Sequence, residues 1–74
     1  MKRLPIDSRA IRSAAYDTEL LILEIEFTNG SIYHYYRVPP ATYQQFCDAD
    51  SKGTFVNQSI KPNFEYREIR KPAR

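Results

Sequence analysis

Residues 20–38 read LLILEIEFTNGSIYHYYRV, a pattern typical of two β-strands joined by a tight turn. In Leu20–Thr28, apolar and acidic side chains alternate with a period of two, as in a strand that buries one face. The dipeptide Asn29-Gly30 that follows is the strongest short signal for a hairpin. Ser31–Val38 is rich in β-branched and aromatic residues, which favour strands. These residues together predict an antiparallel hairpin.

The length of the hairpin loop decides which side chains share a face of the sheet. A two-residue Asn29-Gly30 loop places Tyr33 and Tyr35 on the open face, opposite the side that carries Leu23. A three-residue loop, with Gly30 in a G1 bulge, shifts the pairing by one residue and turns both tyrosines toward the core. We expect the two-residue loop because it gathers more aliphatic surface on one face.

Weaker signals on both sides of the hairpin predict the remaining elements. Pro is favoured at the first position of a helix, apolar residues at spacings of three and four indicate an inward face, and Pro62 ends the second helix. The predicted elements are a strand over Ala10–Tyr16, helices over Pro40–Ala49 and Ser51–Ile60, and a short C-terminal strand over Phe64–Ile69.

The fold class that these elements predict is α+β. We expect a three-stranded antiparallel sheet followed by two short helices on one of its faces, in the order βββαα, with the short C-terminal strand as an optional addition. We expect residues 1–74 to form a single domain, because a chain of 74 residues builds one small core. Residues 1–9 and 70–74 are predicted to be irregular tails.

Composition excludes several classes of protein. Hydrophobic residues make up 42% of the chain, which is too many for a disordered segment. The longest apolar run is Leu20–Leu23, too short for a signal peptide or a membrane span, so we expect a cytoplasmic protein with no membrane partner. One Cys and one His exclude an internal disulfide and a Cys-rich zinc site, so we expect no metal and no cofactor.

The inventory of reactive side chains argues against an enzyme. A nucleophilic pair would need Cys47 close to His34, but Cys47 lies on an apolar helical stripe, where cysteine is usually a small buried hydrophobe. Acidic pairs such as Glu24 and Glu26 are predicted to lie on a solvated face, whereas general acid–base catalysis needs a perturbed pKa in a cleft. An enclosed pocket that holds His34 beside Cys47 or beside a buried acid would revive the enzyme hypothesis.

Charge is distributed unevenly along the chain, although the net charge is only +2. Residues 1–12 and 61–74 each carry a net charge of +3, and the middle segment carries −4. Basic segments attract phosphate, and tyrosines beside an arginine in a strand can stack on bases, as in small RNA-binding sheets. Tyr33, Tyr35 and Arg37 fit that description, provided that the rings lie on the open face.

An ordered set of short motifs resembles the KTSC domain, a bacterial and phage module named for its place at the C-terminus of some lysyl-tRNA synthetases. The resemblance extends over about Ser13 to Ile69 and is most specific in Tyr33-x-Tyr35-x-x-Val38-Pro39 followed by Ser51-Lys52-Gly53-x-x-x-Asn57-x-x-Ile60. It implies a role in RNA binding, carried over here to Tyr33 and Tyr35. The same motif has a structural alternative, in which both tyrosines pack against the second helix.

We therefore predict a non-catalytic nucleic-acid-binding module whose partner is RNA or another single-stranded nucleic acid. The alternative is a protein-interaction module or homodimer that uses the Tyr-rich sheet face, since Tyr and Arg are favoured at interfaces. The residues predicted to contact nucleic acid are Tyr33, Tyr35, Arg37, Lys52, Lys61, Arg67, Arg70 and Lys71.

Overall fold

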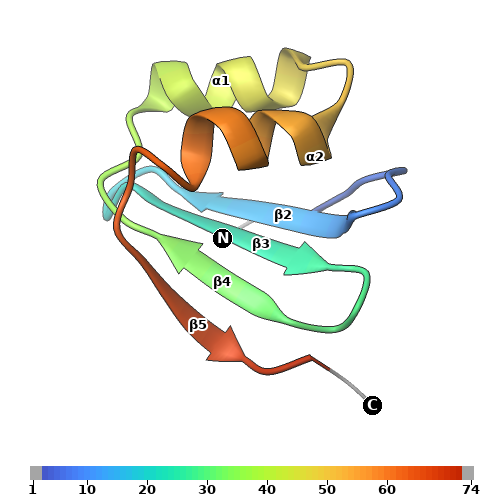
Figure 1. Cartoon of the computed structure of the whole chain (residues 1–74). Helices are drawn as coiled ribbons and strands as arrows, with labels where there is room; N and C mark the ends of the chain where they lie inside the picture. Colours follow the sequence, from blue (N-terminus) through green and yellow to red (C-terminus); the bar gives the residue numbers. More distant parts are fainter. Residues whose placement is uncertain (1–2, 73–74) are drawn as a thin grey trace.

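A computed structural model describes residues 3–72 as an antiparallel sheet with helices on one face (Figure 1). The five strands are neighbours in chain order, β1 to β5, and the helices lie between β4 and β5 in the sequence. The strands are β1 (Arg3–Pro5), β2 (Ile11–Asp17), β3 (Ile22–Phe27), β4 (Ile32–Tyr35) and β5 (Tyr66–Arg70). The helical segments are α1 (Pro40–Asp48), α2 (Lys52–Phe55) and η1 (Val56–Ile60).

The α+β class and the two helices are confirmed, but the prediction of a three-stranded sheet was wrong. The optional C-terminal strand exists as β5, which begins at Tyr66 and includes Arg70. β1 forms within residues 1–9, which were predicted to be irregular, and pairs with β2. Arg3 ties β1 to its neighbours, because its guanidinium donates to Ser13 Oγ at 2.7 Å and forms an ion pair with Glu24. Of the predicted tails, residues 1–2 and 73–74 lie outside the described part of the chain.

The β3–β4 loop has three residues, so the expected two-residue loop was also wrong. Phe27 N donates to Ser31 O at 2.8 Å, and Gly30 N donates to Phe27 O at 2.9 Å. Gly30 has a φ of 93°, which a glycine adopts without steric cost. The pairing is therefore shifted by one residue, with Ile25 opposite Tyr33. This register packs the larger tyrosine rings under the helices and leaves more polar side chains on the open face.

The core lies between the helices and the covered face of the sheet. Fully buried side chains come from β2, β3 and β4 and from the helical segments, among them Ile25, Phe46, Val56 and Ile60. Tyr16 joins the two layers, because its hydroxyl donates to Val38 O at 2.5 Å and its ring stacks on Tyr43, with centroids 4.4 Å apart.

The second helix begins at a serine cap and ends in a wider turn. Ser51 Oγ accepts a hydrogen bond from Thr54 N, as expected for an N-cap residue. The last turn, η1, is a π turn in which Lys61 N donates to Val56 O at 2.8 Å, five residues back. Val56 and Ile60 both face the core in this geometry. No helix within residues 3–72 combines the length and the apolar character needed to span a bilayer.

Candidate nucleic-acid interface

The two tyrosines predicted to stack on bases lie on the covered face of the sheet, not on the open one. Tyr35 is 1% exposed, and burial raises its pKa to about 12. A ring this deeply covered has no free surface for a base, so the expectation for Tyr35 was wrong. Tyr33 is half-buried at the edge of the helical layer, and its hydroxyl donates to Glu68 Oε2 at 3.2 Å.

The predicted cations are scattered over the molecule. Arg37 is exposed beyond the end of β4, and Arg67 and Lys71 lie on or just after β5. Lys52 binds carbonyl groups at the C-terminal end of α1, because its Nζ donates to Cys47 O at 3.0 Å and to Ala49 O at 2.9 Å. Arg70 is engaged with the sheet, whereas Lys61 lines the same groove as Tyr33. Of the eight predicted residues, the structure brings Tyr33 and Lys61 together in one site.

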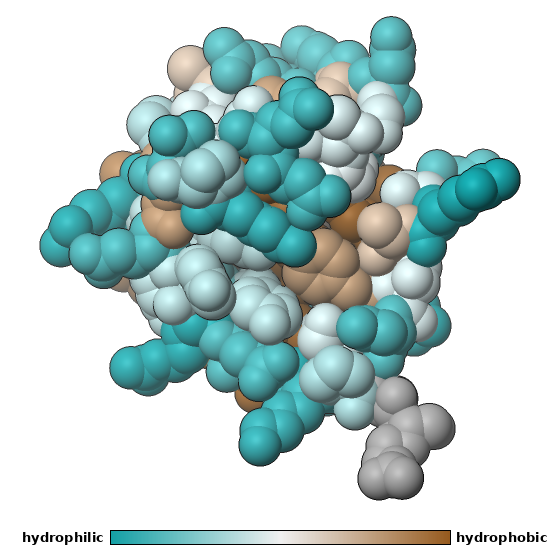
Figure 2. All heavy atoms as spheres, in the orientation of Figure 1, coloured by the Kyte–Doolittle hydropathy of each residue, from teal (hydrophilic) through white to brown (hydrophobic). Residues whose placement is uncertain are grey.

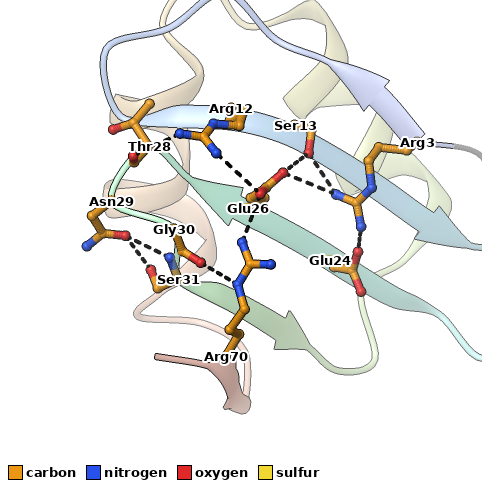
Figure 3. A network of polar contacts seen from close by, with 10 residues as sticks. All are labelled: Arg3, Arg12, Ser13, Glu24, Glu26, Thr28, Asn29, Gly30, Ser31 and Arg70. Atoms are coloured by element: carbon orange, nitrogen blue, oxygen red, sulfur yellow. Dashed lines mark hydrogen bonds and ion pairs between the residues drawn. The ribbon is translucent and has the colours of Figure 1, made fainter. Parts of the chain in front are cut away.

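The open face of the sheet carries a network of ion pairs centred on Glu26 (Figure 3). Ser13 Oγ donates to its carboxylate at 2.8 Å, and the guanidinium groups of Arg70 and Arg12 lie 3.0 and 3.7 Å away. The Ser13 hydrogen bond, followed by Arg70, holds the pKa of Glu26 below its usual value. Arginines from both ends of the chain, Arg3, Arg12 and Arg70, thus meet here, where they pair with the glutamates of β3.

Of the reactive side chains weighed as an enzyme site, His34 meets Glu24 on the open face but does not meet Cys47. His34 lies on the open face and contacts Glu24 at 2.7 Å, whereas Cys47 belongs to α1, which covers the opposite face. Across residues 3–72, no three His, Cys, Asp or Glu side chains are grouped so that they could hold a metal ion.

A groove of about 660 Å³ opens between the second helix and the β3–β4 turn. Figure 2 shows hydrophobic residues, in brown, recessed between teal and near-white residues on this side of the molecule. We call this site the aromatic groove and define it by six of its lining residues, namely Phe27, Tyr33, Tyr66, Asn29, Asn57 and Lys61.

Three neighbouring strands supply the rings of the aromatic groove. Phe27 ends β3, Tyr33 lies in β4 and Tyr66 begins β5. The Phe27 and Tyr33 rings meet edge to face with centroids 5.7 Å apart, and the Tyr33 and Tyr66 centroids are 5.6 Å apart. Tyr66 is 58% exposed, so a large part of this aromatic surface is in contact with solvent.

The polar members of the aromatic groove come from the second helix and from the hairpin loop. Asn57 lies in η1, and Lys61 directly follows that segment with its Nζ 5.4 Å from the centroid of the Phe27 ring. Gly53, Asn57 and Lys61 recur every four residues, which places them along one side of the helix. This spacing, within the motif that begins at Ser51, was the sequence signal that could have identified Asn57.

A second groove, of about 600 Å³, continues from the first along the same helix. It lies between residues 51–54 and the loop at residues 6–10, and both grooves are lined by Ala10 and Asn57. A Cβ atom at Gly53 would lie 3.3 Å from Ala10 Cβ, which is a tight contact. The glycine therefore allows the helix to approach this loop closely.

The five-stranded sheet, covered on one face by a pair of short helices inserted before its last strand, defines a class of small α+β domain. The chain belongs to the KTSC domain family, whose sequence model matches residues 7–64. The crystal structure of a KTSC domain protein from Yersinia pestis is similar, with a TM-score of 0.85 and 40% sequence identity. That comparison covers 92% of this chain and 96% of the other.

Sequence relatives fall into two groups by length. An uncharacterized protein of Stutzerimonas stutzeri is 47% identical over 62 residues, which cover 84% of this chain and 87% of the relative. A lysine–tRNA ligase of Nostoc punctiforme is 33% identical over 63 residues, which cover 85% of this chain but only 11% of that enzyme. These matches indicate no catalytic family for the domain itself.

Proposed function

We propose that this protein is a non-catalytic module that binds single-stranded RNA in the aromatic groove. A base stacks on the exposed rings, above all on Tyr66, and Lys61 contacts a neighbouring phosphate. The observation that carries the proposal is the convergence of three aromatic rings and a lysine in one open groove. Because this binding chemistry requires no nucleophile, acid–base pair or metal, we propose binding without catalysis.

The energetics of such a site suit single strands. Stacking of a base on an aromatic side chain contributes about 1–3 kcal/mol as measured by alanine substitution, and it needs an unpaired base with a free face. Lys61 makes no ion pair with any of the residues 3–72, so its charge is available to a phosphate. With few phosphate contacts, binding at physiological salt has an expected Kd of about 10⁻⁴–10⁻⁶ M.

The family relationship supports RNA as the partner. One relative is a lysine–tRNA ligase in which the matching segment is a small part of a much longer chain. A small domain within a protein named for tRNA is consistent with a binding role toward RNA. We extend that role to the present chain and place its action in the cytoplasm.

A titration with fluorescently labelled single-stranded RNA, followed by anisotropy at low salt, tests the proposal. Tyr66→Ala removes the most exposed ring of the groove and should weaken binding by about tenfold, as expected for one stacked base. Ile69→Ala is the matched control, because Ile69 lies in the same strand and is 47% exposed but does not line the groove. The absence of RNA binding by the unmodified protein at low salt would refute the proposal.

Self-association through β5 is a second candidate function, which the exposure of that strand favours. Within the described chain, β5 pairs only with β4, and all five of its residues are exposed. Tyr66 and Ile69 together give this edge an apolar component. Because the Tyr-rich sheet face is largely covered, a homodimer would use this edge instead. Sedimentation analysis distinguishes the two outcomes: a monomer at high concentration excludes the dimer, and a dimer that Ile69→Lys dissociates supports it.

A further inference from the structure

We infer that the aromatic groove distinguishes bases, with Asn29 and Asn57 recognising the edge of an adenine. This inference rests on the proposed function, because it concerns the base that the groove holds. Three observations carry it: the fixed orientation of the Asn29 amide, the free amide of Asn57, and the aromatic rings that line the same groove as both amides.

The hairpin loop fixes the amide of Asn29. Its Oδ1 accepts hydrogen bonds from Ser31 N at 3.0 Å and from Ser31 Oγ at 2.7 Å. Figure 3 shows the amide nitrogen of Asn29 pointing away from Ser31. Because both hydrogen bonds use the oxygen of Asn29, the Nδ2 group is the donor that remains for a ligand. The loop already holds this group in one orientation, so binding requires no further loss of side-chain entropy to orient it.

The second amide, Asn57, offers both a donor and an acceptor. Its side chain is exposed on η1, lines the groove and makes no hydrogen bond with any residue in the range 3–72. Asn63, by contrast, uses its amide within the helix end by donating to Ser59 O at 2.9 Å. Asn57 is therefore free to pair with a ligand without breaking a contact of the folded chain.

Adenine is the base that these groups match best. An asparagine amide pairs in a bidentate manner with adenine N6 and N7, and this edge is accessible in a single strand. Along the corresponding edge guanine presents two acceptors and each pyrimidine a single polar group, so the donor and the acceptor of one amide are not both paired there. The groove thus prefers a single-stranded RNA that places an adenine on the rings.

The test compares short single-stranded RNAs that are identical except at one central position. We expect adenine at that position to be preferred by about tenfold, the range of one bidentate contact. Asn57→Ala should abolish the preference and leave the affinity for the weakest RNA unchanged. Gln58→Ala is the matched control, because Gln58 is the next exposed residue of η1 and does not line the groove.

A second variant examines the other amide. Asn29→Asp keeps an oxygen for the two Ser31 contacts but removes the Nδ2 donor, so the adenine preference should fall. Equal affinities for all four RNAs, a preference for another base, or a preference that survives Asn57→Ala would overturn the inference and leave the proposed function intact. If the unmodified protein binds none of the RNAs, the proposed function fails and the inference fails with it.

Discussion

His34 Nε2 lies 2.7 Å from Oε1 of Glu24, its direct partner across β3 and β4. Burial lowers the pKa of His34 below its usual value, so at neutral pH the ring is uncharged and donates a hydrogen bond to the carboxylate. The pair exists because the three-residue loop turns His34 to the open face, beside Glu24.

This pair makes stability depend on pH. His34 has a lower pKa in the folded state than in the unfolded state, where it is about 6.5, so the unfolded chain binds more protons as the pH falls. The His34 contribution is therefore complete above pH 6.5 and is lost as the pH falls below it. Urea unfolding between pH 8 and pH 5.5 should show this loss, and His34→Gln should reduce it. An equal pH dependence in both proteins would contradict the assignment.

Two buried tyrosine hydroxyls should respond differently to removal. Tyr16→Phe deletes the hydrogen bond to Val38 O and should lower the free energy of unfolding by about 1 kcal/mol. Tyr35→Phe should leave stability unchanged or slightly raised, because Tyr35 Oη has no partner among the described residues. Denaturant titration of the two variants gives the comparison, and a larger loss from Tyr35→Phe would show that its hydroxyl is satisfied in solution.

The network around Glu26 predicts a salt-dependent contribution to stability. Glu26→Gln weakens the ion pairs with Arg12 and Arg70 and should cost about 1 kcal/mol, since both arginines are more than half exposed. Added salt should shrink that difference. The lowered pKa of Glu26 places its contribution above pH 4.5, with loss as the pH falls further. Glu19→Gln, in the exposed β2–β3 turn, is the control and should change little.

Lys61 should determine part of the salt dependence of RNA binding. Each phosphate contact to a single strand contributes about −0.7 to the slope of log K against log salt. Lys61→Gln should therefore make the slope shallower by roughly that amount and weaken binding to all RNA sequences similarly. Lys71→Gln, outside the groove, should leave binding to the groove unchanged. A loss of base preference in Lys61→Gln would place Lys61 against a base instead of a phosphate.

Local signals predicted most of the elements, whereas long-range contacts decided the rest. The hairpin, the helix starting at Pro40 and the helix expected from Ser51 follow from short patterns and are present. β1 was missed because three residues around a proline are a weak strand signal, and contacts from Arg3 to β2 and β3 hold it in place. The predicted loop length was wrong because burying the Tyr35 ring stabilises the fold more than gathering additional aliphatic side chains on one face of the sheet.

The same distinction applies to the candidate site. The sequence predicted Tyr33 and Lys61 as binding residues, because a tyrosine can stack on a base and a lysine can contact a phosphate. The sequence did not predict which residues lie around them in the fold. Phe27 and Tyr66 were not singled out as binding residues, because the groove forms where three strands and a helix meet. Arg70 has the right charge for a phosphate contact, yet the fold places it against Glu26 and the Gly30 carbonyl.

The π turn of η1 makes the number of residues between Ser51 and Lys61 critical. A deletion before the π turn would rotate everything that follows, the π turn included, by about 100° around the axis. Lys61 would then leave the Phe27 ring, and the chain would enter β5 from a different direction. Exposed side chains of this segment that lie outside the groove can be exchanged without disturbing the fold, but an insertion or deletion would dismantle the groove and the last strand together.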